Sequence, residues 1–222
     1  MSEARLRSPL GLGRAAVILL GLVIAADLFD IWAGVLEIRV AGEILDGIND
    51  DAALRRGELA DALHDWSRAA QTLTLFATAV VFLRWFHRVR VNAEVFDPAR
   101  HTKSRGWAVW GWFCPVVNLW FPRRVALDVW DAGARWADRP GHGLVNSWWT
   151  LWIVSLLADR ATEWRYDTAR GAVGWREALR LMLVADALDI AAAVLAVLVV
   201  LRLTRMQRER ALAGSGFVTA LG

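Results

Sequence analysis

Long apolar stretches alternate with charged ones along the whole chain. Crossing a bilayer as a helix takes about 20 mostly apolar residues. Four stretches come near that length: 15–36, 69–86, 144–158 and 178–201. The third is short for a span, but it is dense in tryptophan. This pattern predicts an all-α protein built as a four-helix transmembrane bundle.

The first two stretches contain features that need explaining. Three arginines precede the first, and Ala25 and Ala26 within it are small, as in a secretory signal peptide. Because the apolar pattern continues through Trp32, we expect the segment to be retained as a helix. The second carries polar residues that a helix can satisfy through its own preceding carbonyls, namely Gln71, Thr72, Thr74 and Thr78.

A tryptophan-rich segment, residues 107–121, lies between the second and third stretches. It is nearly all apolar, but Pro115 removes a backbone donor, and the Asn118 side chain needs hydrogen-bonding partners. Irregular backbone is tolerated at membrane depth only where protein buries it. The sequence therefore predicts a broken re-entrant or interfacial element packed against the other helices.

An amphipathic helix is predicted over residues 122–138. Pro122 suits a first helical turn. At 3.6 residues per turn, one sector is charged and the opposite one is apolar. The charged sector holds Arg124, Asp128, Asp131, Arg135 and Asp138, and the apolar one holds Val125, Val129, Trp130, Gly133 and Trp136. We expect this helix to lie on the cytoplasmic membrane surface.

Composition agrees with a membrane protein. Of the 222 residues, 56% are hydrophobic and mean hydropathy is +0.34, which excludes a disordered chain and a nucleic-acid-binding arm. Fourteen tryptophans stand against one tyrosine, and tryptophan favours the boundary between water and lipid. The single cysteine forbids an internal disulfide. We expect lipids as partners and no nucleic acid.

Charge placement predicts the threading. The net charge is only +3, but 17 of the 26 basic residues fall on one side if both termini are cytoplasmic. The first loop on the other side, 37–65, is strongly acidic. The sequence thus predicts a plasma membrane protein with cytoplasmic N- and C-termini, comprising one integral membrane domain over 1–210 and a short tail over 211–222.

A long aromatic motif carries a family resemblance. Its parts are 82–96, Arg105-Gly-Trp107, the Trp112-Phe-x-Pro-x-x-Asn-Leu-Trp-x-Pro122 core and Asp128-x-Trp130. With them the chain resembles an actinobacterial family of multi-pass membrane proteins known only as a domain of unknown function. The likeness is close over about residues 80–132. It implies a membrane architecture, and it brings no reaction, substrate or partner.

Two pairs of aspartates lie inside apolar stretches. Asp27 with Asp30, and Asp186 with Asp189, are each spaced i,i+3, so each pair presents two carboxylates on one helix face. If the first and fourth helices touch, four carboxylates converge. An ionised aspartate at mid-bilayer costs at least about 2.5 kcal/mol. The cluster must therefore be protonated, paired with arginine or bound to a cation.

Three interpretations of these aspartates stay open. Arg176, Arg180 or a tryptophan indole N–H could satisfy them as a tie between helices. They could instead form a cation or proton pathway. As catalytic residues of a membrane-embedded isoprenoid enzyme, they would hold magnesium and a diphosphate beside a tryptophan-lined pocket. Because the predicted threading places the acids toward the outer leaflet, the enzyme hypothesis is disfavoured, and without it we predict no cofactor.

Other chemistry-bearing residues point to no known fingerprint. Four histidines, at 64, 87, 101 and 142, are scattered without metal-ligand spacing, so we expect them to be solvated or interfacial. Cys114 is flanked by Phe113 and Pro115, which favours a packing role.

The leading function that we predict rests on a collar of basic residues on the cytoplasmic side. Beside the tryptophans of 107–121 it could bind an anionic lipid headgroup or a partner membrane protein, a second copy of this chain included. We therefore predict a non-enzymatic lipid- or partner-binding scaffold. The candidate binding residues are Arg88, Arg105, Trp107, Trp112, Asn118, Trp120, Arg123 and Arg124.

Overall fold

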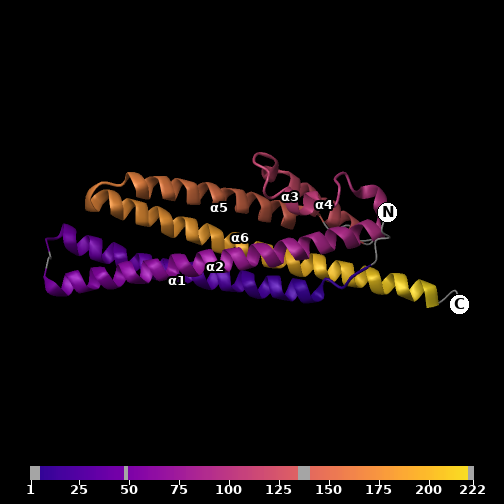
Figure 1. The fold of residues 1–222 in the computed structure, drawn as a ribbon, viewed down its shortest axis with the longest axis horizontal. Coiled ribbons are helices and arrows are strands. Elements are labelled where there is room, and N and C mark those ends of the chain that lie inside the picture. The colour runs from indigo at the N-terminus through magenta and orange to yellow at the C-terminus, as the bar shows by residue number, and fades with distance from the viewer. Residues whose placement is uncertain (1–5, 48–49, 135–140, 220–222) are drawn as a thin grey trace. The chain divides into compact units, whose positions relative to one another are not determined.

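The computed structural model describes residues 6–47, 50–134 and 141–219. Over these residues the protein is 87% helical and has no strand, which confirms the all-α prediction. Four of the helices are long: α1 (Leu10–Leu45), α2 (Asp51–Phe96), α5 (Gly143–Thr168) and α6 (Gly171–Thr219) (Figure 1). The shorter elements are η1 (Pro98–Arg100), α3 (Trp107–Trp110), η2 (Val117–Leu119) and α4 (Phe121–Gly133).

Three of these helices, α1, α2 and α6, are long and apolar enough to cross a membrane. Helix α5 is not among them, so the count of four spans is not confirmed. At about 1.5 Å per residue, the 36 residues of α1 and the 46 of α2 reach roughly 54 and 69 Å, against a hydrocarbon core of about 30 Å. Both helices therefore extend well beyond any bilayer that they cross.

The apolar side chains of the candidate spans mostly point outward. Only 28%, 22% and 39% of the most apolar windows of α1, α2 and α6 are buried inside the protein. On α2, Leu73 and Phe76 are 71% and 73% exposed. An apolar surface of this kind is unfavourable in water and suits contact with lipid.

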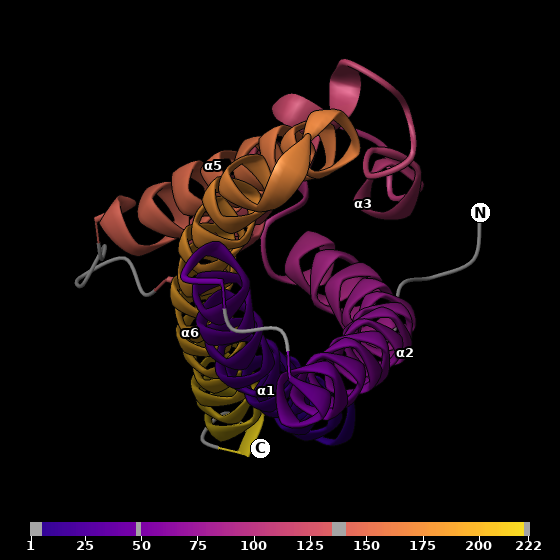
Figure 2. The ribbon, with the colours of Figure 1, turned by 90° about the vertical axis from the view of Figure 1, so that its left-hand side faces the viewer.

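The chain divides into two compact units, and the long helices contribute to both. Unit 1 consists of residues 1–19, 78–149 and 195–222, and unit 2 of residues 20–77 and 150–194. Unit 2 contains the turn that joins α1 to α2 and the turn that joins α5 to α6; Figure 2 is viewed from the side on which both turns lie.

Unit 1 has an aromatic core. Phe82, Phe86 and Trp112 pack with ring centroids 5.7 to 6.0 Å apart, and Trp148 and Trp149 close the cluster. The indole of Trp85 donates to Thr204 Oγ1 at 3.1 Å, which joins α2 to α6. Gly13 makes room for this pair, since a Cβ there would lie 2.9 Å from Thr204 Oγ1.

A buried amide pair fastens the segment before α1 to the same unit. Asn92 Nδ2 donates to the carbonyl of Arg7 at 2.8 Å and to Gln207 Oε1 at 3.1 Å. The amide of Gln207 donates in turn to the carbonyl of Val89 at 2.7 Å. Both side chains are almost fully buried, so these bonds satisfy polar groups that could not reach water.

The tryptophan-rich segment is broken, as Pro115 predicted. It forms one turn of α3, a turn and then η2, and Val116 has a φ of +67°, which is unusual for a β-branched residue. Trp112 points into the aromatic core, whereas Trp110 and Phe113 are 66% and 63% exposed. These observations establish the break but do not test the re-entrant placement.

Helix α4 begins at Phe121 with Pro122 in its first turn and ends at Gly133, short of the predicted end at residue 138. Residues 135–140, on which the rest of that prediction falls, lie outside the described residues. The placement of Asp128 on an exposed face is wrong. Asp128 is buried and accepts hydrogen bonds from the backbone N–H and the hydroxyl of Thr102, because the 97–106 loop covers it.

Candidate functional site

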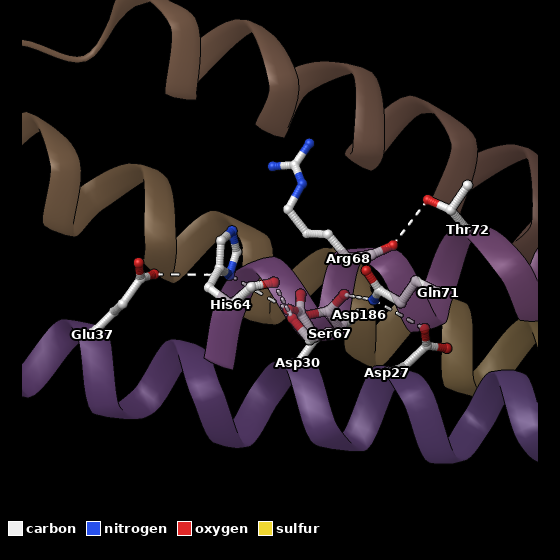
Figure 3. Close-up of polar contacts among 9 residues, drawn as sticks. All are labelled: Asp27, Asp30, Glu37, His64, Ser67, Arg68, Gln71, Thr72 and Asp186. Atoms are coloured by element: carbon white, nitrogen blue, oxygen red, sulfur yellow. Dashed lines mark hydrogen bonds and ion pairs between the residues drawn. The ribbon is translucent and has the colours of Figure 1, made fainter. Parts of the chain in front are cut away.

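A buried cluster of carboxylates in unit 2 is the strongest candidate site. Its centre is Gln71 of α2, whose Nε2 donates to Asp27 Oδ1 of α1 at 3.1 Å and to Asp186 Oδ1 of α6 at 3.2 Å (Figure 3). One amide therefore joins carboxylates from two further helices. Asp27 and Asp186 are 4% and 5% exposed, so water cannot screen them freely.

Asp30, one helical turn from Asp27, is held by a second group of residues from α2. The hydroxyl of Ser67 donates to Asp30 Oδ1. His64 Nδ1 lies 3.5 Å from the same oxygen and 3.9 Å from Glu37 Oε2. Figure 3 shows the imidazole between these two acids of α1. Asp30 also lies within reach of Asp186, which joins the two groups.

A third carboxylate pair extends the cluster. Asp189 of α6 lies within hydrogen-bonding reach of Asp159 of α5, and both are within electrostatic range of Asp27. The cluster thus takes acids from α1, α5 and α6. We use the name carboxylate cluster for this set, namely Asp27, Asp30, Glu37, Asp159, Asp186 and Asp189.

The helix repeat explains why these side chains meet. On α2, His64, Ser67 and Gln71 are spaced i, i+3 and i+7, so they share one face. On α1, Asp27, Asp30 and Glu37 are spaced i, i+3 and i+10, which keeps them within about one quarter of the helix circumference. Gly34 lies on the same helix, and a Cβ there would come within 3.3 Å of side chains of α6. A glycine at this position allows α6 to approach close enough for Asp186 to join.

Several polar atoms of this site make no hydrogen bond to any residue that the structure describes. They are buried and comprise Asp27 Oδ2, Glu37 Oε2, Asp186 Oδ2 and both ring nitrogens of His64. Nearly all buried polar atoms in proteins have a partner, so a group of five in one place calls for an explanation. Atoms of this kind can accept or release a proton without first breaking a bond within the fold.

The arginines proposed to satisfy the aspartates do not do so. Arg180 pairs with Glu177 of its own helix at 2.8 Å, and both side chains are exposed. Within the described part of the chain, neither Arg176 nor Arg180 forms an ion pair with an acid of the cluster. The acids are instead held by neutral groups and by one histidine.

No metal site accompanies the acids. Among the described residues, no group of three or more His, Cys, Asp and Glu side chains is arranged to hold a metal ion.

The residues predicted to bind lipid or a partner lie in unit 1, and several are engaged within it. Arg105 pairs with Glu94 at 2.7 Å, and Arg123 holds Asn146 Oδ1 at 2.8 Å. Arg88 donates to the carbonyl of Ser8. Trp107 packs edge-on against Phe121 with 4.8 Å between ring centroids.

Only some of that set is free to meet a ligand. Trp120 is 48% exposed, and the Arg124 side chain is 55% exposed although it lies 3.4 Å from Asp128. Asn118 is half-buried, and its backbone N–H bonds the carbonyl of Cys114. Among the predicted binding residues, Trp120 and Arg124 are thus two of the more exposed ones.

Sequence reasoning missed five members of the site: Glu37, His64, Ser67, Gln71 and Asp159. The side chains of Gln71, Thr72 and Thr74 were all expected to hydrogen-bond carbonyls of their own helix. Thr72 and Thr74 do so, but Gln71 bonds Asp27 of α1 instead. His64 was expected to be solvated or interfacial, but it is 4% exposed. Its i,i+3 spacing to Ser67 and i,i+7 spacing to Gln71 was the signal that could have identified this face.

The family model of a domain of unknown function (DUF4328) matches residues 50–205. The chain belongs to this family. The DUF4328 range includes His64, Ser67, Gln71, Asp159, Asp186 and Asp189, whereas Asp27, Asp30 and Glu37 precede it. This agrees with the resemblance to an uncharacterised domain family. No curated protein and no solved structure matches the chain.

Proposed function

We propose that this DUF4328 protein moves protons across the plasma membrane through its carboxylate cluster. The observation that carries the proposal is the Gln71 bridge, which holds Asp27 and Asp186 together in helices apolar enough to span a bilayer. Each of these acids keeps its second oxygen buried, with no hydrogen bond to it from the residues that the structure describes.

The chemistry favours a proton over a larger cation. Buried carboxylates are costly when ionised, and like charges close together raise that cost further. A single proton on one oxygen relieves it, whereas a hard metal cation needs about six oxygen ligands. Neighbouring acids, hydroxyls and an imidazole within about 4 Å of each other provide successive positions for a proton.

We further propose how the chain is threaded through the membrane, because the threading sets the depth of the carboxylate cluster. Helix α5 is the third of four crossings, both termini are cytoplasmic, and residues 107–121 lie at or in the cytoplasmic membrane interface. This arrangement keeps the arginine-rich segments inside, and the acidic stretch 37–65 outside. Asp27 and Asp30 then lie a third to a half of the way into the membrane from its outer face.

Proton flux into sealed vesicles tests the proposal. The purified full-length protein is reconstituted with a pH-sensitive dye inside, and a potassium diffusion potential drives the flux. The matched variants are Asp186→Asn, inside the cluster, and Asp167→Asn, an exposed aspartate of α5. We expect wild type and Asp167→Asn to acidify the lumen and Asp186→Asn to fall toward the rate of empty vesicles.

Size-exclusion profiles check that each variant is folded. A wild-type rate equal to that of protein-free vesicles would contradict the proposal. An Asp186→Asn protein that is less stable but conducts as fast as wild type would make the cluster a structural tie between helices.

A second candidate function, lipid binding by unit 1, is favoured by a separate observation. The stretch from Trp110 to Trp120 exposes five large apolar side chains by 48% to 66%, namely Trp110, Phe113, Val116, Leu119 and Trp120. The exposed Arg124 follows directly. Aromatic rings beside a cation suit the headgroup region of an anionic membrane.

Lipid retention after purification tests this function. Replacing Trp110 and Phe113 by serine, or Arg124 by glutamine, is expected to reduce co-purified cardiolipin, and Trp164→Ser on α5, also 65% exposed, controls for the loss of an exposed indole. Equal retention in all of these proteins would exclude a lipid site in this segment.

A further inference from the structure

We infer that protons reach the carboxylate cluster from the Glu37 side and that His64 is the group that passes them to Asp30. The inference rests on the proposed proton movement and adds to it a direction of access and a residue with a defined role. It is carried by the geometry of one imidazole between two acids.

The three side chains form a line. His64 Nδ1 lies 3.9 Å from Glu37 Oε2 and 3.5 Å from Asp30 Oδ1, and Figure 3 shows the ring between the two carboxylates. All three are at least 95% buried, so bulk water does not replace the contacts. From Asp30 the line continues to Asp186 and, through Gln71, to Asp27.

Both ring nitrogens of His64 are buried, and among the described residues their polar contacts are the two carboxylates at ion-pair distance from Nδ1. In a neutral imidazole one nitrogen is a donor and the other an acceptor. A ring fixed by a backbone carbonyl would keep one tautomer, but this ring is not fixed in that way. A buried imidazole that contacts two carboxylates through one nitrogen is therefore suited to proton transfer between them.

The step balances without any other reactant. The protonated carboxyl of Glu37 gives its proton to Nδ1 of His64, the nitrogen that faces both acids, where an N–H bond forms as the O–H bond of Glu37 breaks. The same N–H bond then breaks as an O–H bond forms on the Asp30 carboxylate, and this returns His64 to its neutral state.

The position of the line along the helices indicates the side of access. Glu37 directly follows the proposed span 15–36, and His64 precedes the span 69–86 by one turn. Asp30 and Asp27 lie progressively deeper. Since the acidic stretch 37–65 is external in the proposed threading, protons collect there and enter through Glu37 and His64.

Other charged groups surround this line and set its pH dependence. Around His64 itself are Asp30 and Glu37 of α1 and Arg68 of its own helix. Glu37 also faces Asp61 and Asp65 of α2, and Tyr166 of α5 lies within electrostatic range of it. On α6, Asp186 faces Asp30. Arg68 brings a positive charge within electrostatic range of the ring.

Flux as a function of external pH tests the relay in the full-length protein. The variants are His64→Gln and Glu37→Gln, and the control is His142→Gln, an exposed histidine of unit 1 that contacts Asp131. A positioned proton-transfer group contributes roughly 10²- to 10⁴-fold in rate, and water can replace part of it. We expect His64→Gln to slow flux about tenfold or more and to abolish its change between about pH 5 and 8, where imidazoles titrate.

Two flux outcomes separate this inference from the function on which it rests. If Asp186→Asn abolishes flux while His64→Gln matches His142→Gln at every pH, the relay is wrong and proton movement stands. If wild type carries no flux, the proposed function fails, and the relay fails with it.

A spectroscopic measurement covers the case in which His64→Gln does not fold. In wild-type protein labelled with ¹⁵N-histidine, we expect the His64 ring signals to report reversible protonation and exchange between tautomers, and Glu37→Gln to shift the midpoint. A merely structural histidine would show one fixed protonation state and tautomer across about pH 5 to 8, and that result would overturn the inference.

Discussion

Replacing Gln71 by leucine tests the centre of the carboxylate cluster. The substitution keeps a side chain of similar size but removes the amide that donates to Asp27 at 3.1 Å and to Asp186 at 3.2 Å. Two carboxylates from different helices then face each other without a donor between them. Unlike a substitution of either aspartate, Gln71→Leu leaves every acid in place. It therefore isolates the contribution of the Gln71 bridge to the free energy of unfolding.

The magnitude follows from the two hydrogen bonds. A bond to a charged group contributes about 1.5–3 kcal/mol in soluble proteins, whereas polar contacts between membrane helices average about 0.6 kcal/mol. Two hydrogen bonds at the membrane value give a lower limit of about 1 kcal/mol for the loss in free energy of unfolding. Repulsion between the two acids adds to this loss. We therefore expect Gln71→Leu to lower the free energy of unfolding by about 1–3 kcal/mol.

Reversible unfolding in mixed detergent micelles measures this loss, with Thr72→Val as the control. Thr72 is the next residue along α2, is exposed, and bonds only the carbonyl of Arg68 on its own helix. The pair Gln71→Leu and Asp186→Asn completes a double-mutant cycle, which should show a coupling free energy of at least about 0.5 kcal/mol. A Gln71→Leu protein as stable as Thr72→Val, with no coupling, would refute the bridge.

Three further predictions concern unit 1. Gly13→Ala should destabilise the protein by about 1–3 kcal/mol in thermal unfolding, because its Cβ would lie 2.9 Å from Thr204 Oγ1. The control Gly11→Ala, which has open space around its Cβ, should be neutral or stabilising. Asn92→Leu should cost about 1–3 kcal/mol and expose the segment before α1 to proteolysis, because the carbonyl of Arg7 and Gln207 Oε1 lose their donor. Burial lowers the pKa of His101 below 6.5, so the unfolded chain binds the proton first. Stability should then be complete above about pH 6.5 and decline as pH falls below it, and His101→Gln should flatten that part of the profile; an unchanged profile would contradict the assignment.

The features of the fold that could be predicted from the sequence are those that local spacing and composition determine. Runs of apolar residues predicted α1, α2 and α6 as helices able to span a membrane, and Pro115 predicted the break that separates α3 from α4. The i,i+3 spacing of Asp27 and Asp30 placed two acids on one face. Each of these depends only on residues within a few turns of each other.

Long-range pairing could not be predicted in the same way. Ser67 lies 37 residues from Asp30, and Gln71 lies 115 residues from Asp186, so no local pattern shows that they meet. Asp159 directly follows the short third stretch, where an acid resembles an ordinary helix end. Asp128 was assigned to solvent because the 97–106 loop that covers it has no signal in the sequence of α4.

We propose above that the carboxylate cluster exchanges protons inside the bilayer. Infrared difference spectroscopy of the protein in lipid vesicles across a pH jump tests it most directly, because the C=O stretch of a carboxylic acid appears only when the acid is protonated. The account predicts carboxylic-acid bands that form on acidification and lose amplitude in Asp27→Asn and in Asp186→Asn, but not in Asp167→Asn. A difference spectrum that neither cluster variant alters would contradict it.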